Sequence, residues 1–215
     1  KERLKQIISV IKNLDNSYLT IQGPPGSGKS YTAKHVIAEL LCLGKKVGIS
    51  SNSRKAINNL LFSTAEYCKK KNIKGHFVCR KDDESQVPEY VLVMENKEIS
   101  DHIKPACLIG TTAWGFARDD VKEAFDYLFI DEAGQVSVAN LIGMSRSTKN
   151  IILMGDQMQL GQPSQGSHPE ESGLSILDYS LHTTPTIPET MGVFLGTTFR
   201  MHSAVNKFIS ETIYQ

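Results

Sequence analysis

Residues 23–30, with the sequence Gly-Pro-Pro-Gly-Ser-Gly-Lys-Ser, fit the pattern G-x-x-x-x-G-K-[ST]. This spacing lets the backbone wrap around a phosphate with its N–H groups pointing inward, at the positive end of the helix that follows. Lys29 would then reach the β- and γ-phosphates as a point charge, and the Ser30 hydroxyl would be a ligand of Mg²⁺. The segment predicts a site for ATP and Mg²⁺; a glycine-rich turn without a ligand is the alternative.

Two adjacent acids, Asp131 and Glu132, end the apolar run Phe129-Ile130. If this run is a buried strand, both carboxylates lie at its carboxyl end and face the phosphate loop. In enzymes with a phosphate loop of this kind, the first acid holds the hydration shell of Mg²⁺, and the second orients and deprotonates the attacking water. We assign Asp131 and Glu132 these roles. The alternative is a solvated acidic start of a helix, where Asp and Glu are common.

The elements that would position these residues are short apolar runs separated by helical patterns. Unalternating apolar runs are typical of strands that helices cover on both faces. We expect strands at 18–21, 47–49, 76–79, 107–109, 127–130, 151–154 and 193–195. Helices are expected at 2–14, from about Lys29 to a glycine cap at Gly44, at 53–71, at 172–180, and beyond Val205. The pattern predicts a doubly wound α/β domain with a mainly parallel sheet, which binds its ligands at the carboxyl ends of the strands.

The chain is expected to form one domain over 1–200, with 201–215 starting a linker. Residues 80–105 are mixed and charged, which indicates an insertion. The sequence starts without Met and ends inside a helix-like pattern, so we expect a piece of a longer protein.

The composition narrows the class of protein. At 215 residues, 40% hydrophobic and 22% charged, the chain is not a disordered tail, a collagen or a small disulfide scaffold. The net charge of +1 means that any nucleic-acid binding must be local. Four cysteines without a C-x-x-C pair favour reduced thiols in the cytoplasm. The sequence has no apolar run of the length that a membrane span needs.

Three further segments, 131–135, 155–160 and 198–202, resemble ordered motifs of superfamily 1 helicases. The likeness runs from Gln6 to the last residue and is strongest to the branch that includes the nonsense-mediated-decay helicase. It implies the first RecA-like motor domain of a P-loop NTPase, a three-layer sandwich that uses ATP and Mg²⁺ and acts on single-stranded DNA or RNA. In this family hydrolysis occurs between two such domains, and the motifs of the second are absent from this sequence.

The resemblance also implies roles for single residues. Gln6 would read the adenine edge, Gln159 would sense the γ-phosphate, and Arg200 would contact it as charge develops in the transition state. Phe199 stands where the family usually has tyrosine, so stacking on adenine would survive without the hydroxyl. Alternatives are an exposed helix residue for Gln6, a polar loop group for Gln159, core packing for Phe199 and a surface ion pair for Arg200. The residues expected to contact the nucleotide are Gln6, Gly23, Pro24, Pro25, Gly26, Ser27, Gly28, Lys29, Ser30, Tyr31 and Phe199.

The resemblance implies nucleic-acid contacts as well, made by small polar side chains at strand ends. Ser51, Asn52 and Ser53 match one such motif, and Thr111 and Thr112 match another. Helix capping is the alternative for both groups. Trp114, the only tryptophan, either stacks on a base or lies in the core.

The loop around 167–173 resembles bacterial members of the branch in which the helicase is fused to a RecB-like nuclease. Two rival functions remain. One is a P-loop kinase for a small acceptor, which leaves the motifs at 155–160 and 199–202 without a role. The other is a nucleotide-switched binding module without catalysis.

Overall fold

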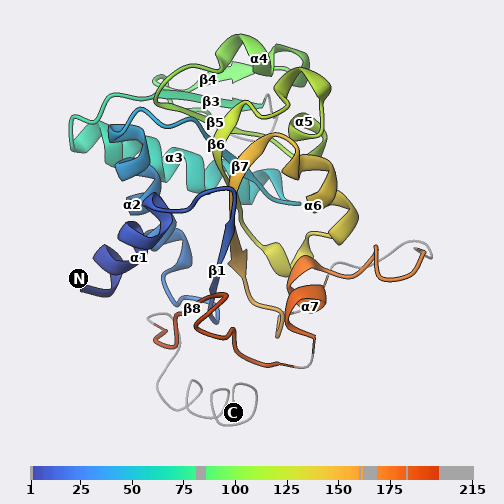
Figure 1. The fold of residues 1–215 in the computed structure, drawn as a ribbon. Helices are drawn as coiled ribbons and strands as arrows, with labels where there is room; N and C mark the ends of the chain where they lie inside the picture. Colours follow the sequence, from blue (N-terminus) through green and yellow to red (C-terminus); the bar gives the residue numbers. More distant parts are fainter. Residues whose placement is uncertain (1, 81–85, 160, 162–168, 183, 199–215) are drawn as a thin grey trace.

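Eight parallel strands form one sheet in the order β4-β3-β5-β2-β6-β7-β1-β8 (Figure 1). The computed structural model describes residues 2–80, 86–159, 161, 169–182 and 184–198. The strands are β1 (Tyr18–Gln22), β2 (Val47–Ser50), β3 (His76–Arg80), β4 (Leu92–Met94), β5 (Cys107–Gly110), β6 (Phe125–Ile130), β7 (Thr148–Gly155) and β8 (Gly192–Phe194). The helices are α1 (Glu2–Lys12), α2 (Lys29–Cys42), α3 (Arg54–Lys70), α4 (Ile99–His102), α5 (Ala113–Phe116), α6 (Val138–Ser145) and α7 (Ile176–Leu181), with 3-10 turns at η1 (Asn96–Glu98), η2 (Asp119–Val121) and η3 (Ala133–Gln135). The prediction of a doubly wound α/β domain is confirmed.

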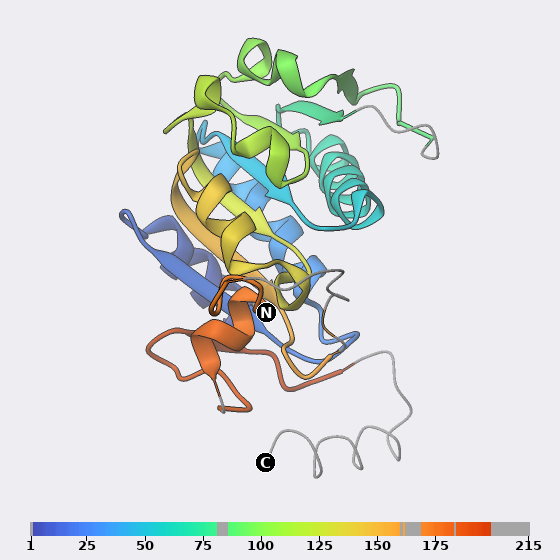
Figure 2. The ribbon, with the colours of Figure 1, turned by 90° about the vertical axis from the view of Figure 1, so that its right-hand side faces the viewer.

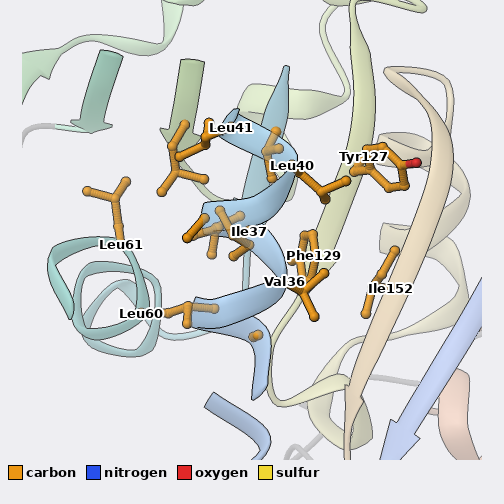
Figure 3. Close-up of a cluster of buried hydrophobic side chains, with 14 of the residues drawn as sticks. Val36, Ile37, Leu40, Leu41, Leu60, Leu61, Tyr127, Phe129 and Ile152 are labelled. Carbon is orange, nitrogen blue, oxygen red and sulfur yellow. The ribbon is translucent and has the colours of Figure 1, made fainter. Parts of the chain in front are cut away.

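Each face of the sheet carries its own hydrophobic core, because successive strand residues point to opposite faces. On β6, Tyr127 and Phe129 pack under α1, α2 and α3, whereas Leu128 and Ile130 pack under α4, α5 and α7. Figure 2 shows the sheet between these two groups of helices. In Figure 3, α2 lies between α3 and the strands, and the labelled side chains fill the space on both sides: Val36, Ile37, Leu40, Leu41, Leu60, Leu61, Tyr127, Phe129 and Ile152. Burial on both faces explains why the central parts of these strands are mainly apolar.

Two glycines set the ends of α2. Gly28 precedes its first residue with a φ of 89°, and Gly44 follows its end with a φ of 72°. The N–H of Gly44 donates to the Leu41 carbonyl at 2.9 Å, and that of Lys45 donates to the Leu40 carbonyl at 3.0 Å. This is the Schellman arrangement, in which glycine takes the left-handed conformation at little cost. The predicted cap at Gly44 is confirmed.

The structure differs from the expected elements in three ways. It contains three short helices that the sequence pattern did not predict, α4, α5 and α6. Residues 92–94, inside the expected insertion, form the edge strand β4, which pairs with β3 in parallel. The helix expected at 172–180 starts only at Ile176, because the Ser175 hydroxyl caps it by accepting from the Asp178 N–H at 3.0 Å. The expected helix beyond Val205 lies outside the described residues. Within the described residues, the helices are too short or too polar to cross a bilayer.

Candidate nucleotide site and nucleic-acid surface

The loop between β1 and α2 has the shape that its glycines allow. Gly26 and Gly28 have φ values of 77° and 89°, in the left-handed region that side chains disfavour. A Cβ on Gly23 would lie 2.6 Å from the Ser27 Oγ and 2.8 Å from the Leu195 carbonyl oxygen. Only glycine therefore fits at this point, where Leu195, the residue after β8, contacts the base of the loop.

Lys29 lies at the start of α2 and folds back over the loop. Its Nζ donates to the carbonyl oxygens of Gly23 at 2.5 Å and Pro24 at 3.2 Å. These bonds hold a positive charge beside the loop, where an anion between the backbone N–H groups would meet it.

The two acids follow β6 directly. The Asp131 N–H donates to the Ser50 carbonyl of β2 at 2.9 Å, and the Glu132 N–H donates to the Asp131 Oδ1 at 3.0 Å. Asp131 is 9% exposed, whereas Glu132 is exposed and has a φ of 54°. Burial raises the pKa of Asp131 to about 6; the nearby Glu132 carboxylate adds to the rise and the Lys29 ammonium opposes it. At neutral pH the buried carboxylate is still mostly ionised.

The phosphate loop and the acid pair face each other across a cavity of about 220 Å³, as expected from the sequence. Its lining consists of Pro25, Gly26, Lys29, Ser30, Asp131, Glu132, Gly134, Gln135, Gly155, Asp156 and Gln159. A neighbouring cavity of about 440 Å³ shares Ser30 and both acids, and reaches Ser53 and Asn59 at the start of α3.

The loop after β7 brings Gln159 to the same cavity. Gln159 donates from Nε2 to the Asp156 Oδ2 at 3.2 Å. The turn at η3 presses against this loop, since a Cβ on Gly134 would lie 2.8 Å from the Asp156 carbonyl oxygen. Likewise, a Cβ on Gly155 would lie 2.9 Å from the Ala133 nitrogen. Two loops from neighbouring strands therefore meet without intervening side chains, and a displacement of one must move the other.

With this geometry established, comparison with known proteins decides the family. The AAA domain family (AAA_19) matches residues 6–166, about three quarters of the chain. The chain belongs to this family. This AAA domain is similar to the DNA replication ATP-dependent helicase/nuclease DNA2 of Gallus gallus, with 24% identity over 221 residues that cover 100% of the chain and 22% of that protein. The Saccharomyces cerevisiae protein of the same name is 30% identical over 153 residues, covering 66% of this chain and 10% of that protein.

Among solved structures, the AAA domain resembles the Arterivirus nonstructural protein 10 (helicase) in complex with DNA. The TM-score is 0.54 at 14% identity, over 100% of this chain and 43% of that one. This likeness supports the fold. The resemblance to the first RecA-like domain of superfamily 1 helicases is confirmed by the family match and the relatives, and the nuclease in the relatives' names agrees with the resemblance at 167–173. The chain spans about a fifth or less of those two relatives.

In the AAA domain, the segment after β2 is joined to the acid pair. The Ser51 hydroxyl donates to the Glu132 Oε2 at 3.3 Å, and the Asn52 amide donates to the Gln135 carbonyl. The Ser53 hydroxyl caps α3 by accepting from the Ala56 N–H at 3.3 Å. The capping alternative is therefore observed for Ser53, while Ser51 and Asn52 link the expected nucleic-acid motif to the nucleotide cavity.

The two threonines after β5, Thr111 and Thr112, differ in their hydrogen bonding. The Thr111 hydroxyl is buried and donates to the Asn96 Oδ1 at 2.8 Å, so it supports the η1 turn. The Thr112 Oγ1 is also buried, but has no hydrogen-bond partner among the described residues. Trp114 is 80% exposed, which excludes the core alternative.

Four residues expected at the nucleotide have weaker support. Gln6 is exposed on α1 and Tyr31 is 57% exposed on α2; among the described residues, neither lines the 220 Å³ cavity. The Tyr31 ring packs instead against the His35 ring, with centroids 4.2 Å apart. Phe199 and Arg200 lie outside the described residues.

The sequence reasoning missed a buried glutamine. Gln22 ends β1, is 0% exposed, donates to the Gln157 Oε1 at 2.6 Å and accepts from the Ile187 N–H at 2.6 Å. Further along, the Thr198 hydroxyl donates to the Pro25 carbonyl at 2.9 Å. These contacts fix the chain from 184 to 198 against the phosphate loop. A polar residue at the end of an otherwise apolar strand was the available signal.

Proposed function

We propose that the chain is the ATP-hydrolysing motor domain of a superfamily 1 helicase, which couples hydrolysis of MgATP to translocation on single-stranded nucleic acid in the full-length protein. The observation that carries the proposal is the cavity in which Lys29, Asp131, Glu132 and Gln159 face one another. A kinase gives no role to the bonds from Ser51 and Asn52 to the segment 132–135, whereas a motor needs such a link between its nucleotide site and its nucleic-acid contacts.

The proposed roles follow the geometry. The loop 23–30 binds the phosphates, with Lys29 supplying the charge. Glu132 is exposed to the cavity, so it orients and deprotonates the attacking water. Gln159 senses the γ-phosphate. Gln6 and Phe199 hold the adenine, and Arg200 stabilises the charge that develops on the γ-phosphate.

Two residues fit the hard oxygen donors that Mg²⁺ prefers. Asp131 is a buried carboxylate that lacks a compensating charge strong enough to keep its pKa low, and Ser30 lines the same cavity. They would hold Mg²⁺, which supplies positive charge to the phosphates.

The partners are proposed from the motifs and from the names of the relatives. Ser51, Asn52, Ser53 and Thr112 contact the strand. Thr111, the fifth residue of these motifs, positions Thr112 beside it, because its hydroxyl donates to Asn96 and its N–H donates to the Ile49 carbonyl. DNA is favoured as the strand, since the relatives are named as DNA replication helicase/nucleases. A second RecA-like domain and a nuclease domain would complete the protein, and the chain alone would bind nucleotide but hydrolyse it slowly. The cytoplasmic location stays a prediction.

The test uses Glu132→Gln in the full-length protein. The variant should keep nucleotide affinity and lose phosphate release stimulated by single-stranded DNA, by about 10²-fold or more, because the general base is gone. Glu123→Gln is the matched control. Glu123 has the same φ of 54° but precedes β6, so it lies at the opposite end of the same strand, away from the cavity. Unchanged turnover in Glu132→Gln contradicts the assignment. ATP binding without turnover in the wild type would support the switch module instead.

A further inference from the structure

A small recess lies between α3 and the carboxyl ends of β3 and β5. Its lining residues are Arg54, Ile57, Asn58, Arg80, Gly110 and Thr112. The recess holds about 10 Å³, which is room for one water-sized group. It therefore suits a single atom or oxygen of a larger ligand that lies across the surface, rather than a whole small molecule.

Two buried polar atoms of the recess are unsatisfied. The Arg80 Nε and the Thr112 Oγ1 have no hydrogen-bond partner within the part of the chain that the structure describes. Buried polar atoms of native proteins nearly always have a partner, so two orphans in one recess point to a ligand. Arginine can only donate and a hydroxyl can donate, which means that the ligand must accept hydrogen bonds.

The charge of the recess selects an anion. Arg54 opens α3, a helix of 17 residues whose positive end lies here, and it adds a second guanidinium to that of Arg80. The six lining residues include no acid. Guanidinium groups pair with phosphate through charge-assisted hydrogen bonds.

The recess also lies between the two segments expected to contact the strand. Arg54 follows Ser53, and Thr112 ends the pair that follows β5. Arg80 ends β3, which is the neighbour of β5 in the register Cys79↔Gly110. A Cβ on Gly110 would lie 2.8 Å from Ile57 and Leu61 side chains, so α3 closes over this strand end and leaves the polar rim open. Of the strands, only β2 lies between β5 at the recess and β6, which the acids follow.

We propose that Arg80 and Thr112, assisted by Arg54, bind one backbone phosphate of a single-stranded nucleic acid. The inference rests on the proposed function, because it adds a contact to the same strand. Arg80 and Arg54 supply the charge that the small polar motif residues lack, which reconciles strand binding with a net charge of only +1.

The test measures binding of fluorescently labelled oligo-dT to the full-length protein by anisotropy, over a series of salt concentrations. Arg80→Gln should weaken binding roughly tenfold. The negative slope of log affinity against log salt should become shallower by about 0.7, the value for one phosphate of a single strand. Thr112→Val keeps the shape and removes an uncharged hydroxyl, so it should weaken binding several-fold without changing the slope. Arg54→Gln removes only the assisting charge, so it should weaken binding and make the slope shallower by less than Arg80→Gln does.

Lys149→Ala is the control. Lys149 is an exposed cation near the start of β7, so it lies at the amino ends of the strands, whereas the recess lies at the carboxyl ends. It should change neither affinity nor slope. The loss in Arg80→Gln should be equal on oligo-dA and oligo-dT, as expected for a backbone contact. Thermal unfolding by circular dichroism checks that each variant is folded; if Arg80→Gln is not, Arg54→Gln and Thr112→Val decide.

Two negative results have different meanings. If the wild type binds single strands and the three variants bind with the same affinity and slope, the phosphate site is refuted and the motor function stands. If the wild type binds no single strand and its ATPase does not respond to one, the proposed function itself fails.

Discussion

Replacing Asp131 by Asn should make the protein more stable and inactive at the same time. Burial raises the pKa of Asp131 from 3.8 to about 6, so the folded state favours the protonated carboxyl. The stability that the protonated group contributes is complete below pH 3.8 and is lost as the pH rises through 6. A rise of roughly two pKa units corresponds to about 3 kcal/mol. An amide has no charge to bury, and its oxygen can still accept the bond from the Glu132 N–H.

The measurement is urea unfolding in EDTA at pH 8 and pH 4, followed by circular dichroism because the only tryptophan is already 80% exposed. At pH 8 Asp131→Asn should exceed the wild type by about 3 kcal/mol, and at pH 4 by less than about 1 kcal/mol. Asp120→Asn is the control: the Arg118 guanidinium lowers the pKa of this exposed carboxyl, so its removal should not stabilise the protein at pH 8. Equal stability of Asp131→Asn and wild type at both pH values would refute the reasoning.

Three further predictions concern the same edge of the sheet. Lys29→Ala should weaken ATP binding at least tenfold in a titration, since it removes the charge beside the loop, and an unaltered affinity would count against the phosphate site. Gly134→Ala should destabilise the protein by about 1–3 kcal/mol and reduce ATP hydrolysis, because its Cβ would meet the Asp156 carbonyl oxygen at 2.8 Å; a fully active, equally stable variant would contradict the tight contact. Trp114→Ala should leave the unfolding free energy within about 0.5 kcal/mol of wild type but weaken oligo-dT binding several-fold; an unchanged affinity would show that the ring does not stack on a base.

The central strands and the phosphate loop could be predicted from the sequence because local patterns determine them. β1, β2, β6 and β7 are buried on both faces along most of their length, so each contains a run of mainly apolar residues. Gly26 and Gly28 take the left-handed conformations that only glycine adopts readily. The acid pair could be placed at the cavity because parallel strands end at the same edge.

Contacts between distant segments could not be predicted in the same way. β4 has three residues, and its apolar run at 91–94 lies in a charged segment. Leu92 and Val93 are nearly half exposed at the sheet edge, so this short run alone did not distinguish an edge strand from an insertion. The Thr111 hydroxyl bonds to Asn96, a partner that only the fold brings near. The recess at Arg80 needed the strand order, because β3 and β5 are neighbours in space although the segment of 26 residues between them includes β4 and α4.

The Ser51 hydroxyl hydrogen can be donated either to Glu132 or to a bound strand, but not to both. A serine hydroxyl has a single hydrogen to donate, and here it is given to the carboxylate that would activate water. Under the proposed function, a phosphate oxygen of the bound strand would compete for this hydrogen, and the Glu132 carboxylate would then lose its bond to Ser51. If strand binding changes the affinity for nucleotide through Glu132, nucleotide binding must change the affinity for the strand by the same factor. The Ser51 hydroxyl is thus a single group through which the nucleotide site and the strand site would be coupled.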